Sequence, residues 1–215
     1  PAGSGKTTAA VARLLQMLEA GLLGGQVLVL TPQRTLAAPY EEALRLSRMG
    51  GGPPNLLTIG GLARRMIDLF WPLVAESAGF AQPDQPPVFL TLETAQYYMA
   101  YLVRPWLESQ QPLFESVTLE RNRLYSQIID NLNKAALVGF PITEIGARLQ
   151  ASWVGSVTAP SQASRQPQRG QIHIYEDVQT CADLFRDFCL RHNLLDFSLQ
   201  MEVFRDHLWD LPHCR

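Results

Sequence analysis

Apolar and polar positions near the start of the chain alternate in a way that predicts a helix followed by a strand. Apolar residues recur at helical spacing over residues 7–23, and Gly24 and Gly25 end that helix. Residues 26–31 (QVLVLT) form a short, β-branched and nearly all-apolar run. Such a run predicts a strand that is buried on both faces of a parallel sheet.

The same alternation continues to about residue 70. A helix is predicted around residues 36–44, and the glycine- and proline-rich residues 50–54 form a loop. A second buried strand is predicted at residues 56–59, and after Gly61 a helix runs to about Phe70. Helix and strand therefore alternate through this part of the chain, as they do in an α/β domain.

Beyond the polar, proline-rich connection at residues 81–87, nearly every periodic segment is helical. Helices are predicted at residues 92–107, with a break or kink near Pro105, and at residues 119–137, 143–153, 177–192 and 196–209. Thr143 is an expected helix cap, and Asp196 opens the last of these helices. One face of the second helix carries Leu124, Ile128, Leu132 and Ala135. Residues 155–171 contain few core-forming side chains, so we expect a flexible loop there.

Composition describes an ordinary folded chain. The 215 residues, 47% of them hydrophobic and 18% charged, are enough for one large domain or for a domain with an insertion. No apolar run reaches the length of a membrane span, so no membrane partner is expected. Cys181, Cys189 and Cys214 have no C-x-x-C spacing, which favours reduced thiols and a cytoplasmic protein. A metal site that uses Cys189 and His192 is the weaker alternative.

Residues 1–8 (PAGSGKTT) carry the strongest chemical signal in the sequence. They match the phosphate-binding loop G-x-x-x-x-G-K-[ST] except for its first glycine, which would fall before Pro1, so we expect a chain that begins inside the motif. Glycines at positions 3 and 5 permit turns that aim backbone N–H groups at phosphate oxygens. Lys6 and Thr7 are the predicted catalytic residues, and Thr7 is the expected Mg²⁺ ligand. The predicted contacts to ATP are Ala2, Gly3, Ser4, Gly5, Lys6, Thr7 and Thr8.

Three further segments follow this loop in an order that resembles superfamily 1 DNA helicases of the UvrD/Rep type. Residues 27–38 (VLVLTPQRTLAA) are similar to the strand, short loop and alanine-rich helix start that follow the phosphate-binding loop in that family. Residues 58–63 (TIGGLA) are similar to its next motif. Residues 194–197 (LLDF) resemble the start of the helix before the family's Walker B strand. Residues 76–190 match the family only in helical character.

The resemblance implies a fold and a domain organisation. The expected fold class is α/β, with the RecA-like parallel sheet of a P-loop NTPase and a mostly helical inserted subdomain. Residues 1–75 would form the first part of the motor core, residues 76–190 the insertion, and residues 191–215 a helix that returns to the core. A second motor domain would follow in the remainder of the helicase chain.

The resemblance also implies an activity. This piece of an ATP-dependent helicase or translocase would bind ATP with Mg²⁺ and would contact single-stranded DNA. The expected DNA contacts are Thr31, Arg34, Thr58 and Gly61, at the carboxyl ends of the predicted strands. The structural alternative is that the threonines cap helices and that Arg34 is a surface cation. Pro32 and residues 59–60 replace aromatic or histidine positions of the family, which puts base stacking there in doubt.

Hydrolysis also needs carboxylates that orient Mg²⁺ and activate water. Residues 172–177 (IHIYED) imitate a Walker B strand, but its acids are reversed and the run contains His and Tyr. Glu176 and Asp177 fit better in the first turn of a helix, which would leave the catalytic acids beyond Arg215. Two other functions stay open: a non-catalytic, helicase-like DNA-binding or scaffold subunit, and a P-loop kinase or nucleotide transferase.

Overall fold

The computed structural model describes residues 5–47, 52–108, 114, 120–157, 169–208 and 211. The chain divides into two compact units, residues 1–65 and residues 66–215, and each unit is described by itself. The helix α3 (Ile59–Val74) begins in the first unit and continues into the second. The predicted organisation into residues 1–75, 76–190 and 191–215 stays a prediction.

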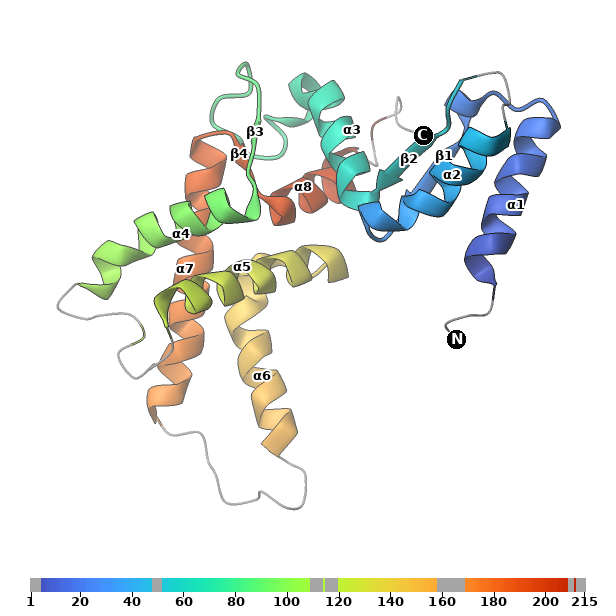
Figure 1. The fold of residues 1–215 in the computed structure, drawn as a ribbon. Coiled ribbons are helices and arrows are strands. Elements are labelled where there is room, and N and C mark those ends of the chain that lie inside the picture. The colour runs from blue at the N-terminus through green and yellow to red at the C-terminus, as the bar shows by residue number, and fades with distance from the viewer. Residues whose placement is uncertain are drawn as a thin grey trace. The chain divides into compact units, whose positions relative to one another are not determined.

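The first unit contains a two-stranded parallel sheet with helices beside it (Figure 1). Before α3, its elements are α1 (Lys6–Glu19), η1 (Gly24–Gln26), β1 (Leu28–Thr31), η2 (Arg34–Ala37), α2 (Ala38–Ser47) and β2 (Asn55–Thr58). Strands β1 and β2 are in register, with Leu28 opposite Asn55 and Thr31 opposite Thr58. The two predicted strands are therefore confirmed, and so is their parallel pairing.

Burial of β1 differs from the prediction. Leu28 and Leu30 are each 45% exposed, whereas Val27, which precedes the strand, and Thr31 are buried. The prediction of a strand buried on both faces was wrong. An all-apolar run permits a strand to be buried, but burial also requires other elements that cover both of its faces. The described residues leave these two leucines about half exposed.

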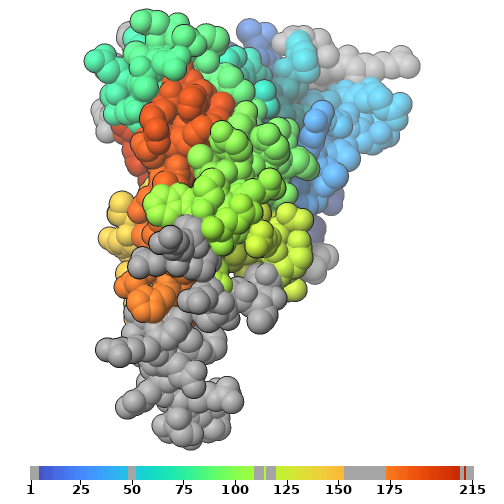
Figure 2. All heavy atoms as spheres, turned by 90° about the vertical axis from the view of Figure 1, so that its left-hand side faces the viewer, coloured from blue at the N-terminus to red at the C-terminus, as the bar shows by residue number. Residues whose placement is uncertain are grey.

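The second unit is mainly helical. After α3 it contains β3 (Val88–Phe89), α4 (Leu92–Leu107), α5 (Arg121–Val138), η3 (Ile142–Glu144), α6 (Ile145–Val157), α7 (Arg169–Arg191), β4 (Leu194–Leu195), α8 (Phe197–Val203) and the π-helical turn η4 (Phe204–Leu208). Helix α4 lies alongside α7, as the green and orange atoms of Figure 2 show. Among the described residues, no helix is both long and apolar enough to cross a bilayer.

The predicted RecA-like parallel sheet is wrong. The described residues form two separate sheets of two strands each, and most of these residues are helical. Strand β4 pairs in parallel with β3, Val88 opposite Leu194, and not with β1 or β2. The sequence signals the strands at residues 28–31 and 55–58 locally, whereas the partner of each strand depends on contacts between distant segments that no local pattern contains.

The core of the second unit lies where α5 packs against α7 and α8. Leu124, Ile128, Leu132 and Ala135 are all buried, which confirms the predicted apolar face of this helix. Helix α5 begins at a Glu120 cap, whose carboxylate accepts from the backbone N–H groups of residues 122 and 123, and it ends at Gly139 with φ 86°. A glycine suits that end because positive φ carries no Cβ penalty for it.

Two details of the predicted helices need correction. The predicted break near Pro105 is wrong, because helix α4 runs on to Leu107 with Pro105 in its last turn. Thr143 lies inside the 3₁₀ turn η3 and is not the cap of α6. The predicted loop at residues 155–171 falls mostly outside the described residues. The predicted helix start at Asp196 is confirmed, and Asp196 caps α8, since its carboxylate accepts from the N–H groups of Ser198 and Leu199.

Candidate functional site

The last residues of the predicted phosphate-binding loop, Gly5 onward, lead directly into α1. Gly5 caps the helix with φ 73° and ψ 10°, and its carbonyl oxygen accepts from the N–H of Ala9 at 2.9 Å. A Cβ added to Gly5 would meet no atom within 4 Å, so the backbone conformation and not the space available calls for glycine. Ala2, Gly3 and Ser4 lie outside the described residues.

The start of α1 is suited to an anion. Lys6 is its first residue, Thr7 and Thr8 complete its exposed first turn, and this turn contains no acidic side chain. The Gly5 cap provides no side-chain acceptor for the first N–H groups of the helix. The helix dipole adds to the attraction. The exposed Thr7 hydroxyl is the group that would coordinate Mg²⁺.

A second site lies at the carboxyl ends of β1 and β2. A pocket of about 360 Å³ is lined by Thr31, Arg34, Ala37, Glu41, Leu56, Leu57, Thr58 and Gly61. These eight residues include all four positions predicted to contact DNA. They meet because parallel strands end at the same edge of a sheet, and Thr31 and Thr58 are directly opposite in the register.

Thr31 fixes the turn that carries Arg34. Its side chain is buried, and its Oγ1 donates to the carbonyl oxygen of Gln33 at 3.0 Å. This bond closes a tight turn between β1 and η2, and η2 begins at Arg34. The exposed Arg34 guanidinium is thereby anchored beside the strand end.

Thr58 caps α3. Its Oγ1 accepts from the N–H of Gly61 at 3.0 Å, and a Cβ on Gly61 would lie 3.2 Å from the same oxygen. The alternative that Thr58 caps a helix is therefore correct. A hydroxyl that accepts one hydrogen bond still has its own hydrogen to donate, so the cap leaves Thr58 able to donate to a ligand in the pocket.

The charges in this pocket are balanced. Arg34 supplies one cation and the exposed Glu41, in the first turn of α2, supplies one carboxylate. Sequence reasoning missed Glu41, and it also missed Ala37, Leu56 and Leu57. The two leucines could have been predicted to line the pocket, because they precede the strand end at Thr58. No sequence pattern indicates Glu41 as a lining residue, since its position depends on how η2 turns α2 back toward the sheet.

The acids of residues 172–177 lie on a helix and not at the end of a strand. Glu176 is paired with His173 at 3.2 Å on the exposed face of α7. Asp177 accepts from the backbone N–H of Phe114 at 2.7 Å. Burial raises the pKa of Asp177, while the bond from Phe114 acts in the opposite direction. The Walker B alternative is therefore wrong for this segment, and the acids also lie further into the helix than its first turn.

The cysteine side chains of α7 belong to its packing. Cys181 and Cys189 are free, buried thiols, and burial raises the pKa of both, in the case of Cys181 to about 12. His192, directly after α7, contacts Phe188, with ring centroids 4.4 Å apart and ring planes tilted by 47°. In the part of the chain that the structure describes, no group of three or more His, Cys, Asp or Glu side chains is arranged to hold a metal ion.

Comparison with known proteins finds no family model that matches this chain and no curated protein that is similar to it. The resemblance to UvrD/Rep-type helicases therefore rests on the sequence motifs alone.

Proposed function

We propose that this chain supplies the ATP-binding and single-stranded-DNA-contacting part of an ATP-dependent DNA helicase or translocase in the cytoplasm. The observation that carries the proposal is the pocket at the ends of β1 and β2. Thr31, Arg34, Thr58 and Gly61 were singled out separately along the sequence, and they line one pocket. The proposal does not require a RecA-like sheet.

The nucleotide part of the proposal is supported by the start of α1. A positive-φ glycine, a lysine and two threonines precede or open a helix whose first turn contains no carboxylate. Backbone N–H groups and Lys6 would bind the phosphates of ATP, and the Thr7 hydroxyl would bind Mg²⁺. Lys6→Ala should abolish binding of a fluorescent ATP analogue in the presence of Mg²⁺. Arg13→Ala, which removes an exposed charge further along the same helix, should leave it unchanged.

The DNA part is supported by the chemistry of the pocket. A guanidinium and a hydroxyl donor contact phosphate oxygens without reading bases, which suits a protein that moves along any sequence. Arg34→Ala should weaken binding of labelled oligo-dT, measured by fluorescence anisotropy, and should lower the slope of log K against log salt by about 0.7. Arg13→Ala is again the control, and equal effects of the two changes would reject the site.

Glu41 offers a test of opposite sign. If phosphate enters the pocket, the Glu41 carboxylate repels it, so Glu41→Gln should tighten oligo-dT binding several-fold. Glu42→Gln is the matched control. Glu42 is the next residue of α2, but it pairs with Arg45 and does not line the pocket. Unchanged binding by Glu41→Gln would count against phosphate in this pocket.

A non-catalytic, helicase-like DNA-binding subunit is the second candidate. It is favoured by Pro32 and residues 59–60, which replace aromatic or histidine positions of the family. Under either proposal the chain as given should hydrolyse almost no ATP. Oligo-dT binding that is unaffected by Lys6→Ala, together with no detectable ATP binding, would select the non-catalytic subunit. An ATPase rate like that of a complete motor would contradict both.

A further inference from the structure

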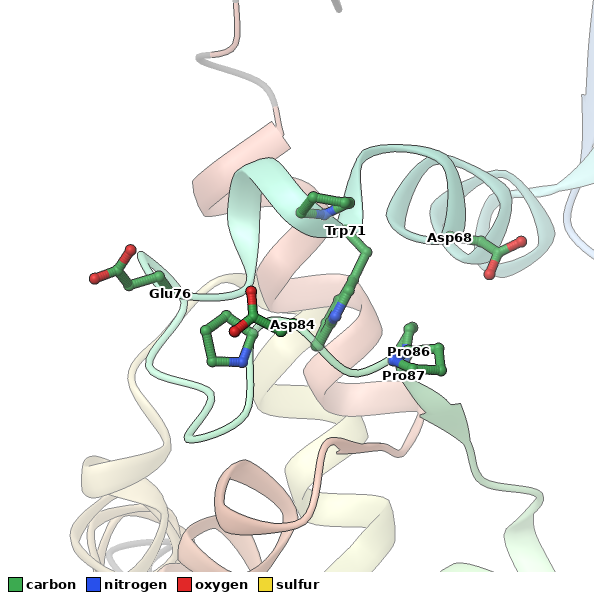
Figure 3. A pocket seen from close by; sticks show the side chains of 8 residues that line it. Asp68, Trp71, Glu76, Asp84, Pro86 and Pro87 are labelled. Carbon is green, nitrogen blue, oxygen red and sulfur yellow. The ribbon is translucent and has the colours of Figure 1, made fainter.

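A second pocket, of about 510 Å³, lies in the second unit between α3 and the connection to β3 (Figure 3). Its lining is divided between two chemical types. Five residues are apolar and three are acidic: Trp71, Pro72, Pro83, Pro86 and Pro87, and Asp68, Glu76 and Asp84. From the sequence, residues 81–87 were expected to be only a connection.

The walls of this pocket are held in place by hydrogen bonds. The indole of Trp71 reaches from α3 to the loop, where Nε1 donates to the carbonyl oxygen of Gln85 at 2.7 Å. The ring also packs edge-on against Phe80, with centroids 4.7 Å apart. Asn193 holds the same loop, because its Nδ2 donates to the carbonyl oxygens of Gln82 and Gln85. The pocket is therefore largely formed before anything binds, which lowers the entropic cost of binding.

The three carboxylates give the pocket a single sign of charge. Asp68, Glu76 and Asp84 are exposed, and no basic residue lines the pocket. Among the described residues, none of the three carboxylates forms an ion pair. A cation that enters the pocket therefore meets negative charges and no positive charge among the lining residues.

Apolar surface continues along the same helix. Leu69 is 69% exposed and Leu73 is 56% exposed, and they lie one turn apart on α3, each next in sequence to a pocket residue. Exposed leucines at this spacing form a ridge beside the acidic pocket. A partner that covers both features must therefore carry positive charge and apolar side chains together.

We propose that this surface binds a peptide segment in which lysine or arginine side chains alternate with apolar ones. Its cationic heads lie near the carboxylates, which are spread along the pocket (Figure 3), and their aliphatic stems lie along Trp71 and the prolines. Nucleic acid is excluded as the occupant because its phosphates meet three negative charges. A bare metal ion is disfavoured because, in the described residues, these carboxylates do not form a group arranged to hold one. The proposal is independent of the function proposed above, since this pocket is in the other unit.

The test measures binding of a fluorescein-labelled octapeptide of alternating lysine and leucine to the full 215-residue chain. The double variant Asp68→Asn, Asp84→Asn should weaken binding at least tenfold, and raising the salt concentration should weaken wild-type binding. The control Asp130→Asn, Asp183→Asn removes the same charge from exposed positions of α5 and α7 and should bind like wild type. Asp68→Glu, which keeps the charge, should also bind like wild type.

Several results would overturn the proposal. These are equal affinity of the pocket variant and wild type, an equal loss in the control variant, and binding of spermidine at this site without binding of the peptide. A peptide with glutamate in place of lysine should not bind, and its binding would also contradict the role of charge. The Asp→Asn changes are isosteric and exposed, so we expect the four proteins to have equal thermal unfolding midpoints. Equal midpoints show that lost binding does not reflect lost folding.

Discussion

At Thr58, a single hydroxyl oxygen connects the stability of a helix with the shape of the candidate DNA pocket. It caps α3 through the N–H of Gly61, and that residue carries no side chain in the space beside the oxygen. A Cβ at position 61 would lie 3.2 Å from Thr58 Oγ1, a distance at which one of the two groups has to shift. Glycine at this position is therefore explained by the cap and not by the backbone angle.

A double-mutant cycle tests this explanation. In a helix, Gly→Ala normally stabilises by about 1 kcal/mol, and loss of a threonine cap costs about 1 kcal/mol. We expect Gly61→Ala to give less than this gain in the wild type and the full gain in a Thr58→Ala background, measured by urea unfolding. The two residues are then coupled. Equal effects of Gly61→Ala in both backgrounds would show that the cap and the glycine are independent.

The buried thiols of α7 give a second prediction at the scale of single residues. Burial raises the pKa of Cys181 from an ordinary value of 9.0 to about 12, and it raises that of Cys189 as well. In a Cys214→Ser background, both thiols should therefore react slowly with Ellman's reagent at pH 8 and rapidly after unfolding in guanidinium chloride. Rapid reaction of the folded protein would contradict the burial.

The same pKa shift determines how stability depends on pH. Above pH 9 the unfolded Cys181 thiol loses its proton while the folded one keeps it, so the unfolded state binds fewer protons. The contribution of the protonated Cys181 thiol to the free energy of unfolding is therefore complete below pH 9, and it is lost as the pH rises from 9 toward 12. Cys181→Ser should make the free energy of unfolding fall less steeply over this range.

At the scale of elements, α8 shows that the start of a helix can be predicted from the sequence. Its cap, Asp196, is buried, and its carboxylate accepts from the N–H groups of Ser198 and Leu199 and from the Ser198 hydroxyl. We expect Asp196→Ala to destabilise the protein by about 2 kcal/mol in denaturant unfolding, the upper end for caps, because the deleted group is buried. Asp196→Asn retains an acceptor oxygen and should cost less than the alanine change. Equal costs of the two changes would argue that the charge and not the cap matters, because both changes remove the charge.

Elements of this kind were predictable because their signals are local. The Asp196 cap, the Gly5 start of α1 and the periodic face of α5 each depend on residues within a few positions of one another. The resemblance to UvrD/Rep-type helicases pointed to Thr31, Arg34, Thr58 and Gly61, and parallel pairing brings them together. The pairing of β4 with β3 was not predictable, because residues 194–197 were expected to begin a helix and the contact joins segments more than a hundred residues apart.

At the scale of the whole molecule, the two units differ in how much apolar surface they bury. All members of the main core cluster belong to the second unit. In the first unit, the buried hydrophobic residues among those described are Leu14, Val27, Ala37 and Ala63. Since local stability follows the density of buried apolar contacts, the first unit should open at a lower free energy than the second.

Hydrogen exchange measured by mass spectrometry tests this difference. Amides of β1 and β2 should exchange by local opening at low denaturant, whereas those of α5 and α7 should exchange only near the global unfolding transition. If the first unit also binds ATP with Mg²⁺, ligand at a hundred times its dissociation constant should raise the protection there by about 2.7 kcal/mol and leave the second unit unchanged. Lys6→Ala should remove this added protection without altering exchange in the ligand-free protein. Equal protection of both units without ligand would contradict the first claim, and unchanged protection with ligand would contradict nucleotide binding.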